Sequence, residues 1–149
     1  MKPLTAAILV LVGVPAGIGA FTFGYAKGFS YLSSDPRACI NCHVMNEQFD
    51  AWQKSGHRHV ATCIECHLPH DGLGKWVAKA DHGWRHSVAF TLQDFKEPIE
   101  MTPADRVIVL ENCVRCHGDL VESIHVTATA TGEELDCLRC HALAGHSGG

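Results

Sequence analysis

The motif Cys-x-x-Cys-His occurs four times in this chain of 149 residues and constrains its fold more than any other feature. All eight cysteines fall into these pairs, and none is left over. Two thiols three positions apart can reach the two vinyl-derived carbons of one porphyrin edge, and the adjacent histidine can then bind the iron. The motifs therefore predict four covalently bound c-type hemes, attached through Cys39, Cys42, Cys63, Cys66, Cys113, Cys116, Cys137 and Cys140.

Other uses of paired cysteines explain this pattern less well. A zinc module would bind through thiolates and has no need of a histidine after every second cysteine. A thioredoxin-like pair usually occurs once, near a βαβ pattern that is not visible here. Disulfides within such pairs would close small loops of little stabilising value. Heme attachment is the interpretation that uses the histidine in all four copies.

The first segment has no charged residue from Pro3 to Ala26 and is bracketed by Lys2 and Lys27. A helix over it would be about 36 Å long, enough to cross a hydrocarbon layer of roughly 30 Å. A cleaved signal peptide is the alternative, but the run exceeds the usual length of roughly 7–15 residues and no clear A-x-A site closes it. We expect a retained single-pass anchor over residues 1–27 in the cytoplasmic membrane, with a heme domain over residues 28–149 facing the periplasm.

Seven histidines lie outside the motifs, and two axial positions per iron make ligation the expected role of about half of them. His146 is favoured because it follows His141 by five residues, and His57 because it sits on a short turn between the first two motifs. Met45 follows the first motif in the pattern CxxCHxM. From spacing alone, Met45 is as well explained by packing as by ligation.

The stretch from Leu73 to Val88 has a strong helical period. Apolar residues that include Trp76 and Trp84 share one face, and the opposite face carries Lys75, Lys79, His82 and His86. Two interpretations stay open. The polar face is solvated, or the helix lays its apolar face on the bilayer surface or on protein and presents Lys79 and His86 to heme 1 and a lipid-borne redox substrate.

Composition and local signals predict a mainly α fold. Thr102-Pro103-Ala104-Asp105 is typical of a helix start, and no strand-like alternation of useful length occurs in residues 27–149. Aromatic residues make up only 7% of the chain, so the porphyrins are expected to serve as the core of short helices and loops. A net charge of −4 argues against binding to nucleic acid.

These motifs together resemble those of the NapC/NirT family of membrane tetraheme quinol dehydrogenases. The resemblance rests on the anchor, the four CxxCH motifs, CxxCHxM in the first, CHxPH from Cys66 to His70 in the second and CHx4H from Cys140 to His146 at the end. The short chain looks most like the family's small subunits of cytochrome c nitrite reductase. The resemblance implies two partners. One is a membrane quinol, with menaquinol favoured, and the other is the multiheme catalytic subunit of a periplasmic nitrite reductase.

The resemblance also implies a role for individual residues. Met45, rather than His43, would bind heme 1, and a lysine from the catalytic subunit would complete heme 2. Proximal ligands of hemes 2, 3 and 4 would be His67, His117 and His141, with His146 and His57 as distal ligands of hemes 3 and 4. Lys79 matches the quinol-site lysine, and His86 stands where some relatives have aspartate beside heme 1, so it is a further candidate ligand. His43, His59, His70 and His125 receive no role.

The expected activity is oxidation of a quinol beside heme 1, with protons leaving through Lys79, His86 and either Asp81 or His82. Electrons would pass outward to the periplasmic reductase. Three alternatives remain: a membrane-tethered electron carrier without a quinol site, a quinol dehydrogenase that serves another reductase, and a reductase with its own substrate.

Overall fold

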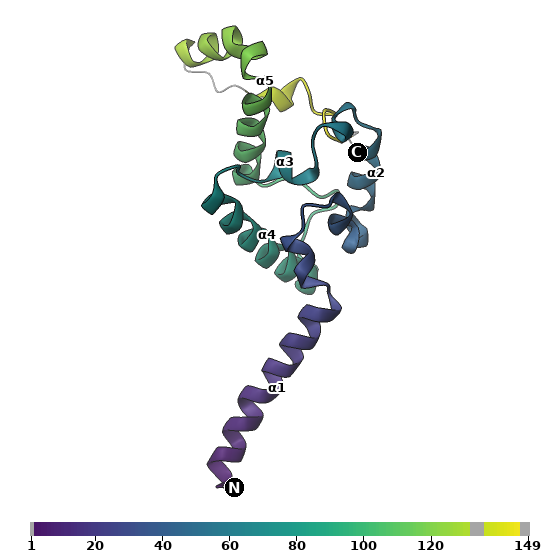
Figure 1. Ribbon diagram of the computed structural model, residues 1–149, viewed down its shortest axis with the longest axis vertical. Helices are drawn as coiled ribbons and strands as arrows, with labels where there is room; N and C mark the ends of the chain where they lie inside the picture. Colours follow the sequence, from purple (N-terminus) through teal and green to yellow (C-terminus); the bar gives the residue numbers. More distant parts are fainter. Residues whose placement is uncertain (1, 132–135, 147–149) are drawn as a thin grey trace. The chain divides into compact units, whose positions relative to one another are not determined.

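The chain forms helices and loops arranged in two compact units, residues 1–33 and residues 34–149 (Figure 1). The computed structural model describes residues 2–131 and 136–146, with the side chains of 123–131 left aside. No strand occurs in these ranges, which confirms the mainly α prediction. The first compact unit includes six residues beyond the expected anchor segment, which ends at residue 27.

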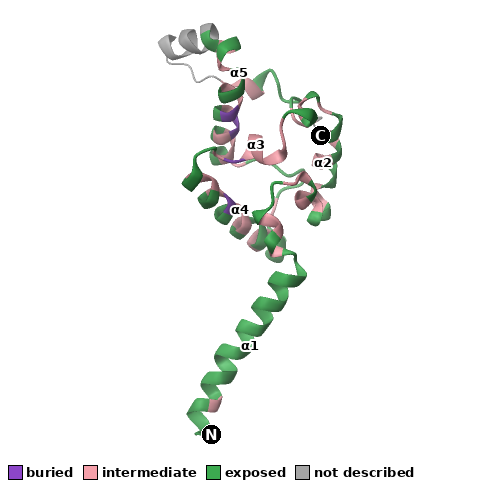
Figure 2. Ribbon diagram, in the orientation of Figure 1, coloured by how far each residue is buried: buried purple, intermediate pink, exposed green. Residues whose placement is uncertain are grey.

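The first unit consists of helix α1, Pro3–Tyr25, and a 3-10 turn η1, Gly28–Leu32. Pro3 opens the helix, where its missing N–H costs nothing. The helix is long and apolar enough to cross a membrane, and its side chains are nearly all exposed (Figure 2). The ring of Phe29 packs edge-on against Phe23 with 5.0 Å between centroids, and this contact explains why the turn belongs with the anchor helix.

The second unit begins with short elements that carry the first two motifs. The four cysteines of these motifs lie within the elements or directly beside them. They are η2 Pro36–Asn41, η3 His43–Met45, α2 Asn46–Lys54, η4 Gly56–His59 and α3 Cys63–His67.

Two longer helices and a final turn complete the second unit. These are α4 Gly72–Leu92, α5 Pro103–Thr131 and η5 Cys137–Arg139. The Asp71 carboxylate caps α4 by accepting from the Gly74 amide. At the start of α5 the amide of Asp105 donates to Thr102 Oγ1 over 3.2 Å, which confirms the predicted helix start.

The polypeptide by itself buries little in either unit. In the ranges that are described, the buried hydrophobic side chains are Leu68 and Val109, with Lys79 and Asn112 as buried polar ones (Figure 2). A globular domain of this size normally buries many large side chains. The second unit is therefore a thin wrapping of helices, consistent with a core that is supplied by something other than side chains.

Candidate functional site

The four CxxCH motifs lie on different local structures. The first spans η2 and η3, the second is helix α3, the third lies within α5, and the fourth begins with η5. All eight cysteines are free of disulfides, and each is partly or fully exposed. Helical turns separate the two cysteines of the second and third motifs by three positions, which brings their side chains to one side of the helix, as attachment to a single porphyrin edge requires.

The motif cysteines approach one another in the order of the chain. A hydrogen bond with the Cys63 thiol and, to a lesser extent, the positive charge of Lys79 lower the pKa of Cys39. Burial, then the neighbouring Cys116, raises the pKa of Cys66. Burial and the adjacent Cys137 and Cys66 raise that of Cys113. The first motif therefore adjoins the second, the second the third, and the third the fourth.

The two histidines favoured as distal ligands are oriented for metal binding. The Nδ1 of His57 donates to the Ala144 carbonyl over 2.8 Å, and the Nδ1 of His146 donates to the Gln48 carbonyl over 2.9 Å. A histidine that ligates a metal typically donates one ring N–H to a carbonyl and uses the other nitrogen for the metal. Both side chains thus leave Nε2 for an iron, and the residues present fit heme.

Both of these imidazoles lie beside motif histidines. The rings of His57 and His117 are 6.2 Å apart between centroids, and those of His146 and His67 are 6.1 Å apart. The assignment of His146 to heme 3 and of His57 to heme 4 stays a prediction, because a ring distance does not identify the heme that a histidine binds. Sequence spacing cannot tell which motif a distant histidine reaches, because the intervening loops decide that.

The second motif holds its histidine in a neutral form. Burial, with smaller effects from His146 and His82, lowers the pKa of His67 to about 4. A ligating imidazole must be unprotonated, so this environment suits a proximal ligand.

Several other histidines use Nε2 for contacts within the protein. His82 Nε2 lies 2.8 Å from Asp105 Oδ1, His70 Nε2 lies 3.1 Å from the Glu65 carbonyl, and His59 Nε2 accepts from Arg58 over 2.8 Å. These contacts agree with the absence of an assigned role for His59 and His70. His125 lies outside the side chains that are described.

The geometry of a zinc module is not seen. No three His, Cys, Asp or Glu side chains converge on one point in residues 2–122 and 136–146. A structural zinc site needs four such ligands at about 2.0–2.3 Å from the metal.

Lys79 is turned inward from α4, next to the first motif. Its side chain is only 7% exposed, and Nζ lies 5.3 Å from the centroid of the Trp76 ring. Burial, and then the nearby Lys75 ammonium, lowers the pKa of Lys79. The interpretation of this face as solvated therefore fails at Lys79.

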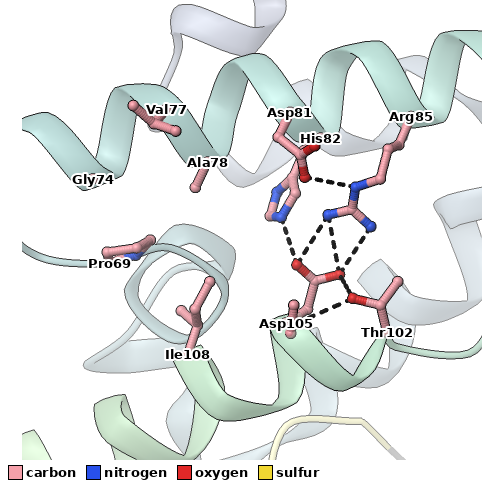
Figure 3. Close-up of a pocket in the computed structure, with 11 residues that line it drawn as sticks. Pro69, Gly74, Val77, Ala78, Asp81, His82, Arg85, Thr102, Asp105 and Ile108 are labelled. Carbon is pink, nitrogen blue, oxygen red and sulfur yellow. Dashed lines mark hydrogen bonds and ion pairs between the residues drawn. The ribbon is translucent and has the colours of Figure 1, made fainter.

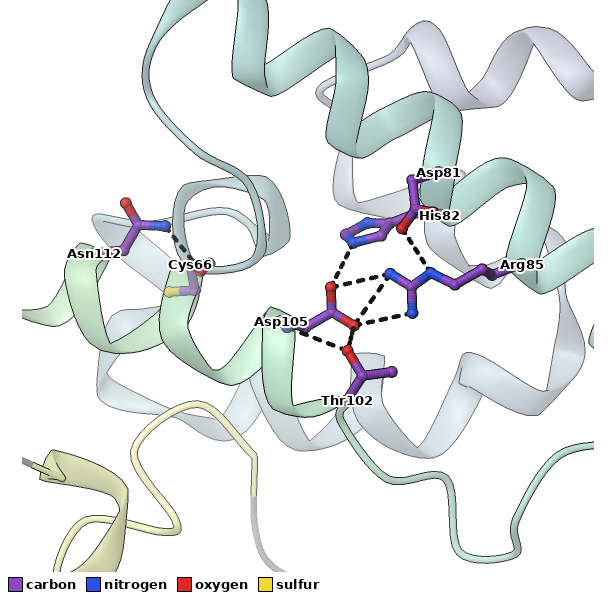
Figure 4. A network of polar contacts seen from close by, with 7 residues as sticks. All are labelled: Cys66, Asp81, His82, Arg85, Thr102, Asp105 and Asn112. Carbon is purple, nitrogen blue, oxygen red and sulfur yellow. Dashed lines mark hydrogen bonds and ion pairs between the residues drawn. The ribbon is translucent and has the colours of Figure 1, made fainter.

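The four residues proposed for proton release belong to two arrangements. His86 stacks on His82 with 5.8 Å between ring centroids. Asp81 accepts from Arg85 Nε over 2.6 Å, and His82 bonds to Asp105, so both join a polar network between α4 and α5 (Figure 4). These contacts also give Asp81 and His82 a structural role, which is to connect α4 with α5 and to hold Arg85.

Asp105 is the centre of this network, which we call the α4–α5 clamp: Asp81, His82, Arg85, Thr102 and Asp105. Arg85 donates to both oxygens of Asp105 over 3.1–3.3 Å, and Thr102 Oγ1 donates over 2.6 Å. Burial opposes ionisation of Asp105, but the hydrogen bonds from Arg85, Thr102 and His82 outweigh it and hold its pKa well below the usual value.

A pocket of about 510 Å³ opens beside the clamp, between α4 and the start of α5 (Figure 3). Its walls combine the clamp with small apolar side chains. They are Pro69, Gly74, Val77, Ala78, Asp81, His82, Arg85, Thr102, Ala104, Asp105 and Ile108.

In the first motif, the methionine that follows the histidine is less exposed than the histidine itself. Met45, at the end of η3, is partly buried, whereas His43 is exposed. This difference supports Met45 as the side chain that serves heme 1.

Asp105 and Asn112 have structural roles that sequence patterns do not indicate. The spacing of Thr102 and Asp105 predicts a helix start, but it does not predict the bonds of Asp105 to His82 and Arg85 of α4. Asn112 is 7% exposed and donates through Nδ2 to the carbonyls of Cys66 and Leu68, each over 2.9 Å. Its place before Cys113 gives no indication of this role.

Comparisons with known proteins agree with the motif geometry. The model of the NapC/NirT cytochrome c family, N-terminal region, matches residues 1–117. The chain belongs to the NapC/NirT cytochrome c family. As a member of that family it binds heme c covalently, and α1 gives it the membrane anchor expected from the sequence.

Relatives within the NapC/NirT family extend over nearly the whole chain. Cytochrome c-type protein NrfH of Wolinella succinogenes is 38% identical, covering 97% of this chain and 87% of its own length. The cytochrome c nitrite reductase subunit NrfH of Nitratidesulfovibrio vulgaris is 30% identical, covering 93% and 82%.

A solved structure shows the same fold. The crystal structure of the cytochrome c nitrite reductase NrfHA complex bound to the HQNO inhibitor contains a chain that is 26% identical, with a TM-score of 0.62. The match covers 89% of this chain and 87% of that one.

Proposed function

We propose that this chain is the membrane-anchored quinol dehydrogenase subunit of a cytochrome c nitrite reductase. The observation that carries the proposal is Lys79, a buried amine packed on Trp76 and held beside the first heme-attachment motif. The names of the NrfH relatives and of the NrfHA complex support the nitrite reductase assignment. The α1 helix keeps the domain at the membrane, where a lipophilic quinol is found.

Four hemes are proposed, one for each motif. His67, His117 and His141 serve as proximal ligands of hemes 2 to 4, Met45 serves heme 1, and His57 and His146 supply distal imidazoles. When bound, the hemes accept the two electrons of the quinol singly and relay them outward. The order of cysteine contacts from the first motif to the fourth supports a relay in that order.

Lys79 takes one of the two protons that the quinol releases as it gives up two electrons. A phenolic oxygen becomes more acidic as charge leaves the ring, and a nearby amine of lowered pKa has a fraction in the neutral form that can accept the proton. Burial provides that lowered pKa here. His86, an exposed residue of α4 that stacks on His82, is the acceptor of the second proton or a ligand of heme 1.

The heme domain is placed on the periplasmic side, with menaquinol as substrate and the multiheme nitrite reductase catalytic subunit as partner. Lys2 supports this orientation, because positive charge tends to stay on the cytoplasmic side. Heme attachment through CxxCH fits the same side.

Steady-state oxidation of a menaquinol analogue by the full chain tests the proposal. Lys79→Met keeps the length of the side chain and removes the amine, and its rate is expected to fall by about 10²-fold or more. Lys54→Ala, at the exposed end of α2, is the control and keeps the wild-type rate. Reduction of each variant by dithionite shows that the hemes are loaded.

Three outcomes would decide against parts of this proposal. Wild-type rates in both Lys79→Met and His86→Ala would show that the quinol site lies elsewhere. Failure of the wild-type chain to accept electrons from any quinol analogue, or indifference to HQNO, would instead support a tethered electron carrier. Oxidation of the reduced chain by nitrite without the catalytic subunit would identify a reductase with its own substrate.

A further inference from the structure

The apolar side of α4 is exposed along most of the helix. Leu73, Trp76, Val77, Ala80 and Trp84 fall within about 100° of one another and extend over about 16 Å. Their large side chains are exposed to 78% at Leu73, 51% at Trp76, 61% at Val77 and 72% at Trp84. None of the five carries a charge. We call this surface the tryptophan stripe.

The α4–α5 clamp fixes the stripe in this outward position. His82 and Arg85, on other sides of the helix, bind Asp105 of α5 over 2.8 and 3.1 Å. Lys79 is buried on the inward side. Rotating α4 to cover the tryptophans would break the clamp and expose Lys79. The stripe therefore needs a partner outside the second unit, because continuous apolar surface of this kind marks an interaction site.

Lipid is the partner that the chain itself brings within reach. Helix α1 ends at Tyr25 and the second unit begins at Ser34, so residues 26–33 are the whole connection. At about 3.5 Å per residue, such a connection spans less than about 30 Å. A connection this short keeps a bilayer that holds α1 within reach of the second unit.

The composition of α4 also matches the membrane interface. Tryptophan is enriched where the hydrocarbon meets the headgroups, and its ring is buried there while its N–H stays near water. A helix with an uncharged apolar face and a polar opposite face lies in the plane of the interface. The charged Lys75, Asp81 and Arg85 lie away from the stripe, as such a helix requires.

We propose that α4 lies in the bilayer interface through the tryptophan stripe and forms a second membrane contact besides α1. The contact does not depend on quinol oxidation, so it can hold or fail independently of the proposed function. It accounts for an apolar face that stays exposed while the clamp and the buried Lys79 hold other sides of α4 against the second unit.

Lipid-phase photolabelling of the full, heme-loaded chain in nanodiscs tests this contact. A phospholipid with a diazirine on its acyl chain is activated, and tryptic peptides are quantified by mass spectrometry. Residues 76–79 and 80–85 form separate peptides, each with one tryptophan. Both are expected to be labelled along with the α1 peptide. The control peptide, residues 97–106, carries Ile99 and Met101 at 39% and 40% exposure and stays unlabelled.

Three variants sharpen the result. Trp84→Glu places a charge on the stripe and is expected to abolish labelling of peptide 76–79, whose own sequence is unchanged. Trp84→Phe and Ile99→Glu are expected to leave the labelling of peptide 76–79 unchanged. Heme content, measured by absorbance, confirms that each variant has matured.

Two results would overturn the proposal. Labelling of peptides 76–79 and 80–85 no stronger than that of peptide 97–106 would show that the stripe does not meet lipid. Labelling that disappears in the complete complex with the catalytic subunit would show that a protein surface covers the stripe.

Discussion

The histidines of this chain fall into two groups, according to which ring nitrogen forms a hydrogen bond with the protein. His57 and His146 donate from Nδ1 to backbone carbonyls and keep Nε2 for a metal. His70 and His82 use Nε2 for contacts within the protein. Counting residues showed that the chain has more histidines than motifs, but a count cannot show which ring nitrogen remains for iron. The hydrogen bonds in the structure supply that distinction.

Replacement of Met45 is expected to change one heme only. Met45→His exchanges a thioether for an imidazole, and because methionine ligation raises the potential, the midpoint of heme 1 should fall. Redox titration followed by absorbance measures this shift. Met101→His, at a loop residue that is 40% exposed, is the control. Unchanged midpoints in Met45→His would show that Met45 only packs beside the motif.

Loss of Asn112 is expected to destabilise the link between the second and third motifs. Asn112→Ala removes the amide group that donates to the carbonyls of Cys66 and Leu68. A buried acceptor left without a donor lowers the free energy of unfolding by about 1–3 kcal/mol. The midpoint of urea unfolding of the heme-loaded protein measures the change. Asn46→Ala, at an exposed residue of α2, should leave it nearly constant. Equal midpoints for both variants would contradict a structural role for Asn112.

At the scale of elements, α4 shows what helical periodicity can and cannot predict. The apolar and polar faces expected over 73–88 are those that the helix Gly72–Leu92 presents. Periodicity identifies the faces but leaves open which one turns inward. The contacts of Lys79 and of the clamp decide this, because they turn Lys79 and His82 toward the rest of the unit, whereas His86 is exposed.

The α4–α5 clamp is expected to give stability that depends on pH. The pKa of Asp105 lies below its usual value of 3.8 in the folded chain, so its ionisation favours folding above that pH. This contribution is lost as the pH falls below 3.8 toward the folded-state pKa. The gap in unfolding midpoint between wild type and Asp105→Asn should be widest near neutral pH and narrow below pH 4.

A series of unfolding curves across pH checks the role of the clamp. Asp94→Asn, at an exposed residue after α4, is the matched control, and its unfolding midpoint should equal that of the wild type at all pH values. A gap for Asp105→Asn that stays constant across the acid range would show that the charge of Asp105 contributes nothing to folding.

At the scale of the whole molecule, the expectation of a core made by porphyrins agrees with the small number of buried side chains in the described ranges. Leu68 and Val109 are the buried hydrophobic residues there, which is too little to hold a domain of this size together. Covalently attached groups that pack against the helices would supply the missing apolar area.

The number of hemes can be counted directly. Intact-mass measurement of the mature chain is expected to show four attached hemes. Cys137→Ser combined with Cys140→Ser should reduce the mass by one heme and leave the other three in place. The control is Ser33→Ala, at an exposed residue outside the motifs, which keeps the full complement. Fewer than four hemes in the wild-type chain would contradict one heme for each motif.

The sequence alone determined the properties that depend on local spacing. Heme attachment follows from cysteines three positions apart, the anchor from an uncharged run, and the start of α5 from Thr102 and Asp105. The tertiary structure decided the properties that depend on residues far apart in the chain. The order of motif contacts, the orientation of α4, the neighbours of His57 and His146, and the bonds of Asn112 all join separate elements. Loop paths bring such residues together, and short-range patterns do not encode those paths.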